Sequence, residues 1–181
     1  MKNNALTLLL SLFSLLFTAQ MSFSQGEGAI TAGGGLIYGS EIETLGIGLN
    51  GQYFITDNLA GQVGLNFFFP NKESVSVFEQ KSSLWTINLN GNYYFDISNE
   101  KIKPYALGGI NIANYKFNTD FPTDPDFEFE SDFSKTYFGL NIGGGADFYV
   151  TEKFTPFAQL KYVISDLDQL VLMAGVRFNI Y

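Results

Sequence analysis

The stretch TINLNGNYYF, residues 86–95, carries the pattern that decides the fold. Apolar and polar side chains alternate along it. One parity holds Ile87, Leu89, Gly91, Tyr93 and Phe95, and the other holds Thr86, Asn88, Asn90, Asn92 and Tyr94. Strict alternation is typical of a β-strand whose two faces meet different surroundings. Because Asn is depleted from ordinary strands, the face with three Asn residues needs an environment that favours uncharged amides.

The same alternation recurs along the rest of the chain and predicts eight strands. Most are about eleven residues long, close to the ~9–11 that a tilted strand needs to cross a bilayer. The links alternate between short ones, such as 56–58 and 151–153, and longer or more variable ones, such as 70–82 and 116–135. This layout is typical of an outer-membrane barrel. The predicted strands are 28–38, 44–55, 59–69, 84–95, 103–115, 136–150, 154–164 and 170–180.

The polar parity indicates which face is inside. A water-exposed sheet surface carries mixed Lys and Glu, whereas this parity holds mainly Asn, Gln and Gly, with Asp147, Lys161 and Arg177 as its few charges. Such a face suits a narrow interior in which Asn88, Asn90 and Asn92 bond other amides. The apolar parity would then face lipid. The alternative is a soluble, lipocalin-like barrel that holds an apolar ligand.

Aromatic residues gather near both ends of the predicted strands, as they do in the girdles of membrane barrels. A general preference of aromatics for strands explains their number but not this clustering. The short-turn end is predicted to hold Tyr53, Tyr93, Phe95, Tyr105, Phe148, Phe157 and Phe178, and the long-loop end Tyr38, Phe67, Phe69, Trp85, Phe138 and Tyr162.

Composition excludes several classes of function. The 181 residues carry a formal net charge of -8, which argues against nucleic-acid binding because that needs a basic surface. The chain has no Cys and no His, so it has no disulfide, thiolate zinc site or Cys nucleophile, and it lacks the commonest general base. We therefore expect no catalytic residues, no metal and no cofactor.

The N-terminal segment 1–24 has a basic residue, then an apolar run, and then small residues that suit a cleavage site. This pattern predicts a secretory signal peptide. Residues 25–181 would then be one mature barrel domain. The alternative is an uncleaved anchor helix, although the apolar run is shorter than the ~20 residues of a spanning helix.

Three segments carry a family resemblance: KPYALGGI at 103–110, FTPFAQLKY at 154–162 and GVRFNIY at 175–181. With the signal peptide, they make the chain resemble the small eight-stranded outer-membrane barrels of the OmpA/OmpX type, often grouped as a porin family. The resemblance implies an all-β, antiparallel up-and-down transmembrane barrel in a Gram-negative outer membrane. It also implies a lipid-embedded monomer with extracellular loops and periplasmic termini. The composition, rich in Asn and in acidic residues, resembles that of proteins of Bacteroidota.

The closing strand looks like the signal that barrel-assembly machinery recognises, with Phe178 and Ile180 in the lipid-facing phase and Tyr181 one residue past it. Inside the barrel, turn geometry predicts Asp147, Gln159 and Arg177 at one level, with Asp147 near Ala158 and Gln159. Lys161 would lie nearby. A buried ion-pair network is the structural interpretation, and a gate or selectivity group is the functional one. An eight-stranded barrel is barely wider than its own side chains.

The longest link, 117–135, is acidic and aromatic. Five carboxylates fall at every second position: Asp124, Asp126, Glu128, Glu130 and Asp132. A solvated acidic loop, a site for a hard cation such as calcium, and a hairpin edge that pairs with a partner strand all remain open. We therefore predict a non-enzymatic protein with a structural or adhesion-like role, with a small or gated porin as the alternative.

Overall fold

The computed structural model describes residues 26–75, 78–99, 101–120, 131–151 and 153–180. These residues form nine strands joined by turns. The strands are β1 (Ile30–Gly39), β2 (Thr44–Phe54), β3 (Leu59–Phe68), β4 (Asn71–Val75), β5 (Phe78–Tyr94), β6 (Ile102–Asp120), β7 (Ser131–Phe148), β8 (Phe154–Ile164) and β9 (Gln169–Asn179). No helix long and apolar enough to span a membrane occurs in this part of the chain. The predicted signal peptide, residues 1–24, lies outside the described residues and stays a prediction.

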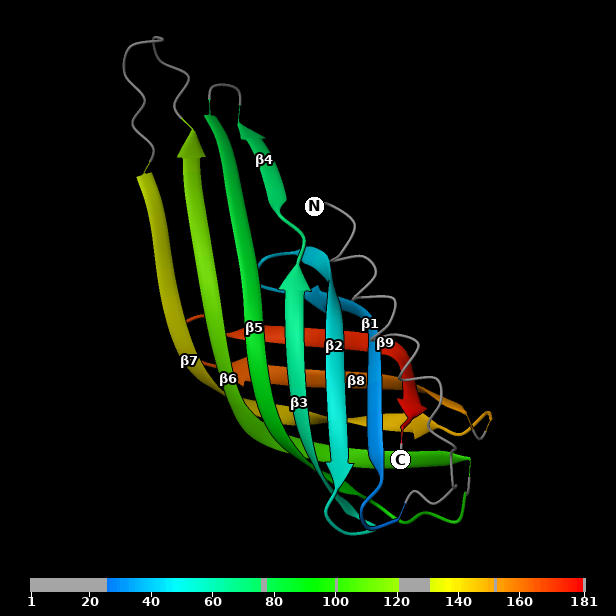
Figure 1. Cartoon of the computed structure of the whole chain (residues 1–181). Coiled ribbons are helices and arrows are strands. Elements are labelled where there is room, and N and C mark those ends of the chain that lie inside the picture. The colour runs from blue at the N-terminus through cyan, green and yellow to red at the C-terminus, as the bar shows by residue number, and fades with distance from the viewer. Residues whose placement is uncertain (1–25, 76–77, 100, 121–130, 152, 181) are drawn as a thin grey trace, which may run out of the picture.

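Eight of the strands close into an antiparallel barrel. Neighbours in sequence pair around the ring, β3 pairs directly with β5, and β9 pairs with β1 to close it. Closure leaves the wall of the barrel without free edges, which is what a sheet in lipid requires. The predicted eight-stranded up-and-down barrel is confirmed (Figure 1).

The two faces of the wall differ as the alternation indicates. Asn88 and Asn92 point inward, with exposed fractions of 2% and 0%. Leu49 in the middle of β2 points outward and is 54% exposed, and it stands in a continuous outer band of Leu, Ile, Val and aromatics. A soluble barrel with an apolar pocket would place these residues the other way round. The arrangement is that of a membrane barrel.

The link predicted at 70–82 is largely strand, which corrects the sequence-based boundaries. It contains β4 and the first part of β5, while β6 and β7 also run past their predicted ends. These strands form a sheet that continues beyond the barrel on the long-loop side (Figure 1). At ~3.3 Å per residue, the 19 residues of β6 span about 60 Å, which is more than a tilted strand needs to cross a core of ~30 Å. We call this sheet of β4 and the outer parts of β5, β6 and β7 the extension.

Two aromatics assigned to the short-turn girdle are instead buried inside the barrel. Tyr105 shares the inward parity of Leu107, and Phe157 shares that of Gln159. Room for the Tyr105 ring comes from Gly145, where an added Cβ would lie 2.5 Å from the Tyr105 Oη. The other predicted girdle residues are outward and exposed at both ends of the barrel.

The barrel interior is packed in layers. One apolar cluster lies toward the short turns, another lies mostly toward the long loops, and a polar layer separates them. The first cluster contains Ala29, Phe54, Ala60, Tyr94, Tyr105 and Leu107. The second contains Ile37, Phe68, Leu84, Ala113, Phe157, Val163, Val171 and Met173.

Candidate functional site in the barrel interior

An ion pair crosses the interior between β7 and β9. Arg177 Nη1 contacts Asp147 Oδ1, and both side chains are buried. The two residues lie on strands that are separated by β8. Their side chains therefore reach across the inner face of β8 to contact each other. A buried charge is tolerated when it is paired in this way.

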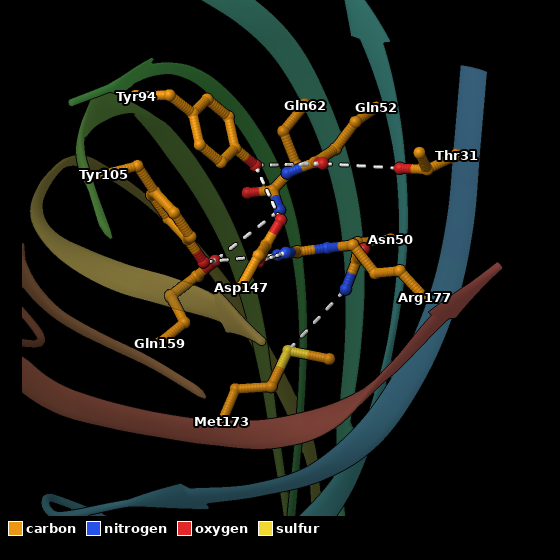
Figure 2. Close-up of polar contacts among 10 residues, drawn as sticks. All are labelled: Thr31, Asn50, Gln52, Gln62, Tyr94, Tyr105, Asp147, Gln159, Met173 and Arg177. Atoms are coloured by element: carbon orange, nitrogen blue, oxygen red, sulfur yellow. Dashed lines mark hydrogen bonds and ion pairs between the residues drawn. The ribbon is translucent and has the colours of Figure 1, made fainter. Parts of the chain in front are cut away.

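The other two nitrogens of the Arg177 guanidinium also donate hydrogen bonds (Figure 2). Its Nε donates to Asn50 Oδ1 at 3.2 Å, and its Nη2 donates to the Tyr105 hydroxyl at 3.2 Å. Its Cζ lies 3.9 Å from the centroid of the Phe157 ring. The guanidinium is therefore held by four side chains, which fixes it in one position.

A tyrosine completes the carboxylate side of the pair. The Tyr94 Oη lies 3.1 Å from Asp147 Oδ2 and 3.2 Å from Gln52 Oε1. Since a phenol carries one proton, it donates to one of these oxygens at a time. Gln52 Oε1 also accepts from the Thr31 hydroxyl at 3.3 Å, so the network reaches β1 (Figure 2).

Gln159 joins the ion pair through Tyr105, which donates to Gln159 Oε1 at 3.1 Å. The predicted register is offset from the observed one. Asp147 lies opposite Phe157, and Arg177 lies opposite Thr155. Because the offset is small and the side chains are long, Asp147, Gln159 and Arg177 still belong to one network. The sequence analysis did not identify Tyr94 and Tyr105 as the residues that connect this network. Tyr94 shares the parity of the Asn triplet, and this parity could have placed it inside the barrel.

Lys161 lies apart from the ion pair, which corrects its predicted place in that network. Its Nζ donates to Asn88 Oδ1. Lys161 is two residues beyond Gln159 on β8, farther from the short turns, and there the interior is lined by asparagines. It therefore belongs to the amide layer.

The amide layer is a connected set of hydrogen bonds. Asn88 Oδ1 accepts from Asn111 Nδ2 at 2.8 Å and from Asn141 Nδ2 at 3.1 Å. Asn141 Nδ2 also lies 2.7 Å from Asn90 Oδ1, and Asn90 Nδ2 donates to Gln62 Oε1 at 3.1 Å. Asn111 and Asn141 share the inward parity of their strands, so the alternation pointed to them, but neither was singled out.

Asn92 differs from the other two residues of the Asn triplet. Neither its Oδ1 nor its Nδ2 has a hydrogen-bond partner in the described part of the chain. It lies opposite Ala60 on one side and Leu107 on the other, both members of the apolar cluster near the short turns. The expected bonding between amides thus stops short of Asn92.

The interior has little free space. A cavity beside Lys161 has room for about one water molecule. Its polar lining consists of Asn50, Gln62, Asn66, Asn88, Asn90, Gln159 and Lys161, and Val171 and Met173 are among its apolar lining residues. The described interior therefore forms a packed polar plug, held at both ends by apolar clusters.

The remaining predicted site residues are those of the acidic link and of the closing strand. Asp124, Asp126, Glu128 and Glu130 fall outside the described residues, whereas Asp132 lies in β7 opposite Asn118. In the closing strand, Phe178 is exposed on the outer face, and Ile180 is partly buried. Tyr181 is not among the described residues.

Several solved structures of outer-membrane proteins share this architecture. The N-terminal barrel domain of Pseudomonas aeruginosa OprF matches with a TM-score of 0.63 and 19% identity, over 85% of this chain and 98% of that one. Ail, the attachment invasion locus protein of Yersinia pestis, matches with a TM-score of 0.58 and 16% identity, over 86% and 99%. A major outer membrane protein of Thermus thermophilus matches with a TM-score of 0.67 and 11% identity, over 84% and 98%. At these identities the likeness shows the fold alone.

The sequence itself gives the family. No curated protein matches it closely enough to suggest a narrower role. Residues 5–178 match the profile of the outer membrane protein beta-barrel domain, which is nearly the whole chain and agrees with the closed barrel and its apolar outer band. The chain belongs to the outer membrane protein beta-barrel family.

Proposed function

We propose that this protein is a non-enzymatic outer-membrane barrel that binds a partner at the cell surface by adding a strand to its extension. The observation that carries the proposal is a free edge. β7 pairs with β6 along Ser131–Phe148, but it pairs with β8 only from Leu140 to Asp147. Within the described part of the chain, residues 131–139 therefore have a neighbouring strand on one side only.

The orientation follows the usual plan of such barrels, with short turns in the periplasm and long loops outside. In this orientation both ends of the barrel domain face the periplasm, because β1 begins and β9 ends at the short-turn rim. There, Ile180 N donates to Ile30 O at 2.8 Å. The extension then stands in the extracellular medium. The protein works as a lipid-embedded monomer, and Phe178, Ile180 and Tyr181 serve barrel-assembly machinery during insertion.

The backbone groups on the free edge can be identified residue by residue. Tyr149 N donates to Lys101 O at 2.8 Å, so the odd-numbered residues of β7 bond to β6. In an antiparallel ladder the alternate residues bond to the opposite side. The even-numbered residues Ser134, Thr136 and Phe138 therefore direct their N–H and C=O groups away from β6. A row of such groups is a template for an added strand.

The side chains beside this edge suit an extended partner. Ser134 and Lys135 are exposed, and Phe138 is 73% exposed. Tyr137 packs under Lys135, whose Nζ lies 4.6 Å from the ring centroid. Phe138 also belongs to the long-loop girdle, so it marks the membrane-side end of this edge, and the small polar residues beyond it leave room for an added strand. Ail, a protein of the same fold, is named as an attachment invasion locus protein, and this supports an adhesion-like role.

A proline at Thr136 tests the edge. Thr136→Pro removes an N–H that points away from β6, a position where proline is tolerated in sheets, so the barrel should still fold. Thr136→Val is the matched control, since it removes the same hydroxyl but keeps the N–H. Bacteria that display each variant would be measured for adhesion to immobilised laminin and fibronectin and to cultured epithelial cells.

We expect adhesion by the wild type and the Val variant and its loss in the Pro variant. All three should show the same gel shift between heated and unheated samples, which reports a folded barrel. Equal adhesion by the Pro variant would overturn strand addition. Deletion of 121–130 is a second arm, because adhesion that survives the Pro variant but not the deletion would assign binding to the acidic loop.

The small porin is the weaker candidate, because the plug leaves room for about one water molecule. Planar-bilayer conductance tests it. We expect no conducting channels from the wild type. Arg177→Ala should show single-channel current steps only if the substitution disrupts the packed interior. Well-defined channels from the wild type would favour the porin.

A further inference from the structure

We propose that the barrel interior binds one small monovalent inorganic anion, of which chloride is the commonest in the medium, beside Lys161. The site is the water-sized cavity between β2, β3, β5, β8 and β9. This proposal is independent of the adhesion role, because it concerns the closed interior and not the extension.

With Lys161 in its ammonium form, the buried charges of the described residues sum to +1 and do not balance without an anion. The buried charged side chains of the described residues are Asp147, Lys161 and Arg177. Asp147 is the ion-pair partner of Arg177. Lys161 is 3% exposed, and its hydrogen bond within the described residues goes to the neutral oxygen of Asn88. A buried ammonium without a counter-charge is costly, and an adjacent anion would offset that cost.

Hydrogen-bond donors around the cavity are in excess. Arg177 Nε donates to Asn50 Oδ1, and this fixes the orientation of the Asn50 amide. Asn50 Nδ2 then points toward Met173, where its acceptor is the sulfur at 4.0 Å (Figure 2). Gln62 Nε2 reaches Gln159 Oε1 at the long distance of 3.5 Å. Both hydrogen bonds of Gln159 within the described part of the chain use its oxygen, which leaves its Nε2 to donate elsewhere. An ammonium also has three protons, of which Lys161 uses one.

Most acceptors around the cavity, by contrast, are occupied; among the described residues no hydrogen bond reaches Asn66 Oδ1, whose Nδ2 donates to Thr86. Asn88 Oδ1 and Asn90 Oδ1 accept from Asn141, and Gln62 Oε1 accepts from Asn90. Gln159 Oε1 accepts from Tyr105, and Asn50 Oδ1 accepts from Arg177. Lining that offers free N–H groups and few free oxygens favours an acceptor-only guest, and a positive charge beside it favours an anion over a water.

The size of the cavity sets the chemical class. Space for about one water admits a halide with small side-chain shifts, but not phosphate, sulfate or a carboxylate. Val171 and Met173 close one wall with apolar atoms, which suits a weakly hydrated ion. The cavity would therefore select by size as well as by charge.

Two experiments test the site. Crystals of the intact barrel grown in sodium bromide should show an anomalous peak in contact with Lys161 Nζ. In urea titrations, the wild type should be more stable in sodium chloride than in sodium gluconate of equal ionic strength. Above the dissociation constant, each tenfold rise in chloride should raise the folded-to-unfolded ratio up to tenfold.

Lys161→Met removes the charge and keeps an unbranched side chain, and it should lose the chloride response. Lys153→Met, at an exposed turn position, is the matched control and should keep it. A water instead of bromide at Lys161, or the same chloride response in Lys161→Met, would overturn the proposal. If Lys161→Met does not fold, the bromide experiment alone decides.

Discussion

Asp147→Asn tests the buried ion pair most directly. The substitution keeps the size of the side chain but removes its charge, and so it leaves the Arg177 guanidinium buried without a counter-charge. Removing one partner of a buried pair costs about 3–5 kcal/mol. The neutral contacts to Asn50 and Tyr105 and the Phe157 ring at 3.9 Å remain, and a desolvated cation–π contact contributes about 2 kcal/mol. We therefore expect the lower end, about 3 kcal/mol.

The reciprocal substitution should behave alike. Arg177→Met leaves the Asp147 carboxylate with the Tyr94 hydroxyl as its remaining donor, and we expect a similar loss of about 3 kcal/mol. The double variant removes both charges together. Replacing a whole buried pair by neutral groups of similar volume is often close to neutral, so its loss should be well below the sum of about 6 kcal/mol.

The free energy of unfolding can be measured for all four proteins, refolded in lipid vesicles and titrated with urea. The single tryptophan, Trp85, is a suitable probe because it lies on the outer face and is 37% exposed. A loss below about 1 kcal/mol in Asp147→Asn would mean that Arg177 reaches water, and the sealed polar plug would be wrong. A double variant that loses the full sum would show that the two charges are not coupled.

Three further predictions concern packing, hydrogen bonding and the lipid face, each measured by the same urea titration. Gly145→Ala should lose about 1–3 kcal/mol, because the new Cβ would lie 2.5 Å from Ala158 O and from the Tyr105 hydroxyl; Gly61→Ala, with nothing within 4 Å, should be neutral, and equal losses would contradict the packing. Asn92→Leu should gain about 1–2 kcal/mol by removing an amide without partners, whereas Asn90→Leu should lose about as much by freeing Asn141 and Gln62; a loss in Asn92→Leu would reveal a missing partner. Leu49→Arg should lose about 2–4 kcal/mol in lipid, and an unchanged stability would place β2 outside the membrane.

The sequence predicted the barrel because lipid imposes one rule on every strand that crosses it. An apolar outer face must alternate with an inner face, so each wall strand carried the signal independently. The extension was missed for the same reason. Alternation is required only where one face of a strand meets lipid. A strand that continues past the membrane need not keep it, and residues such as Lys81, Ser82 and Ser83 were therefore predicted as a link.

For the interior site, the sequence predicted which residues point inward but not which of them contact one another. Asp147, Lys161, Arg177 and the asparagines share the polar parity of their strands. That parity was assigned to the interior because it carries so few charges. It could not choose partners, since a side chain can reach across an intervening strand, as Arg177 does over β8. Tyr105 was assigned to the rim because an aromatic near a strand end fits a girdle as well as a core. Its true place depends on the space that Gly145 leaves.

The uninterrupted passage of β5, β6 and β7 from the wall into the extension has a mechanical consequence. These strands have 17, 19 and 18 residues and no break at the rim. A pull on the extension along the strands therefore loads the β5–β6 and β6–β7 ladders in shear, with many hydrogen bonds resisting together. The same pull across the strands would open them one bond at a time. An attachment at this edge would thus withstand drag directed away from the cell far better than drag parallel to its surface.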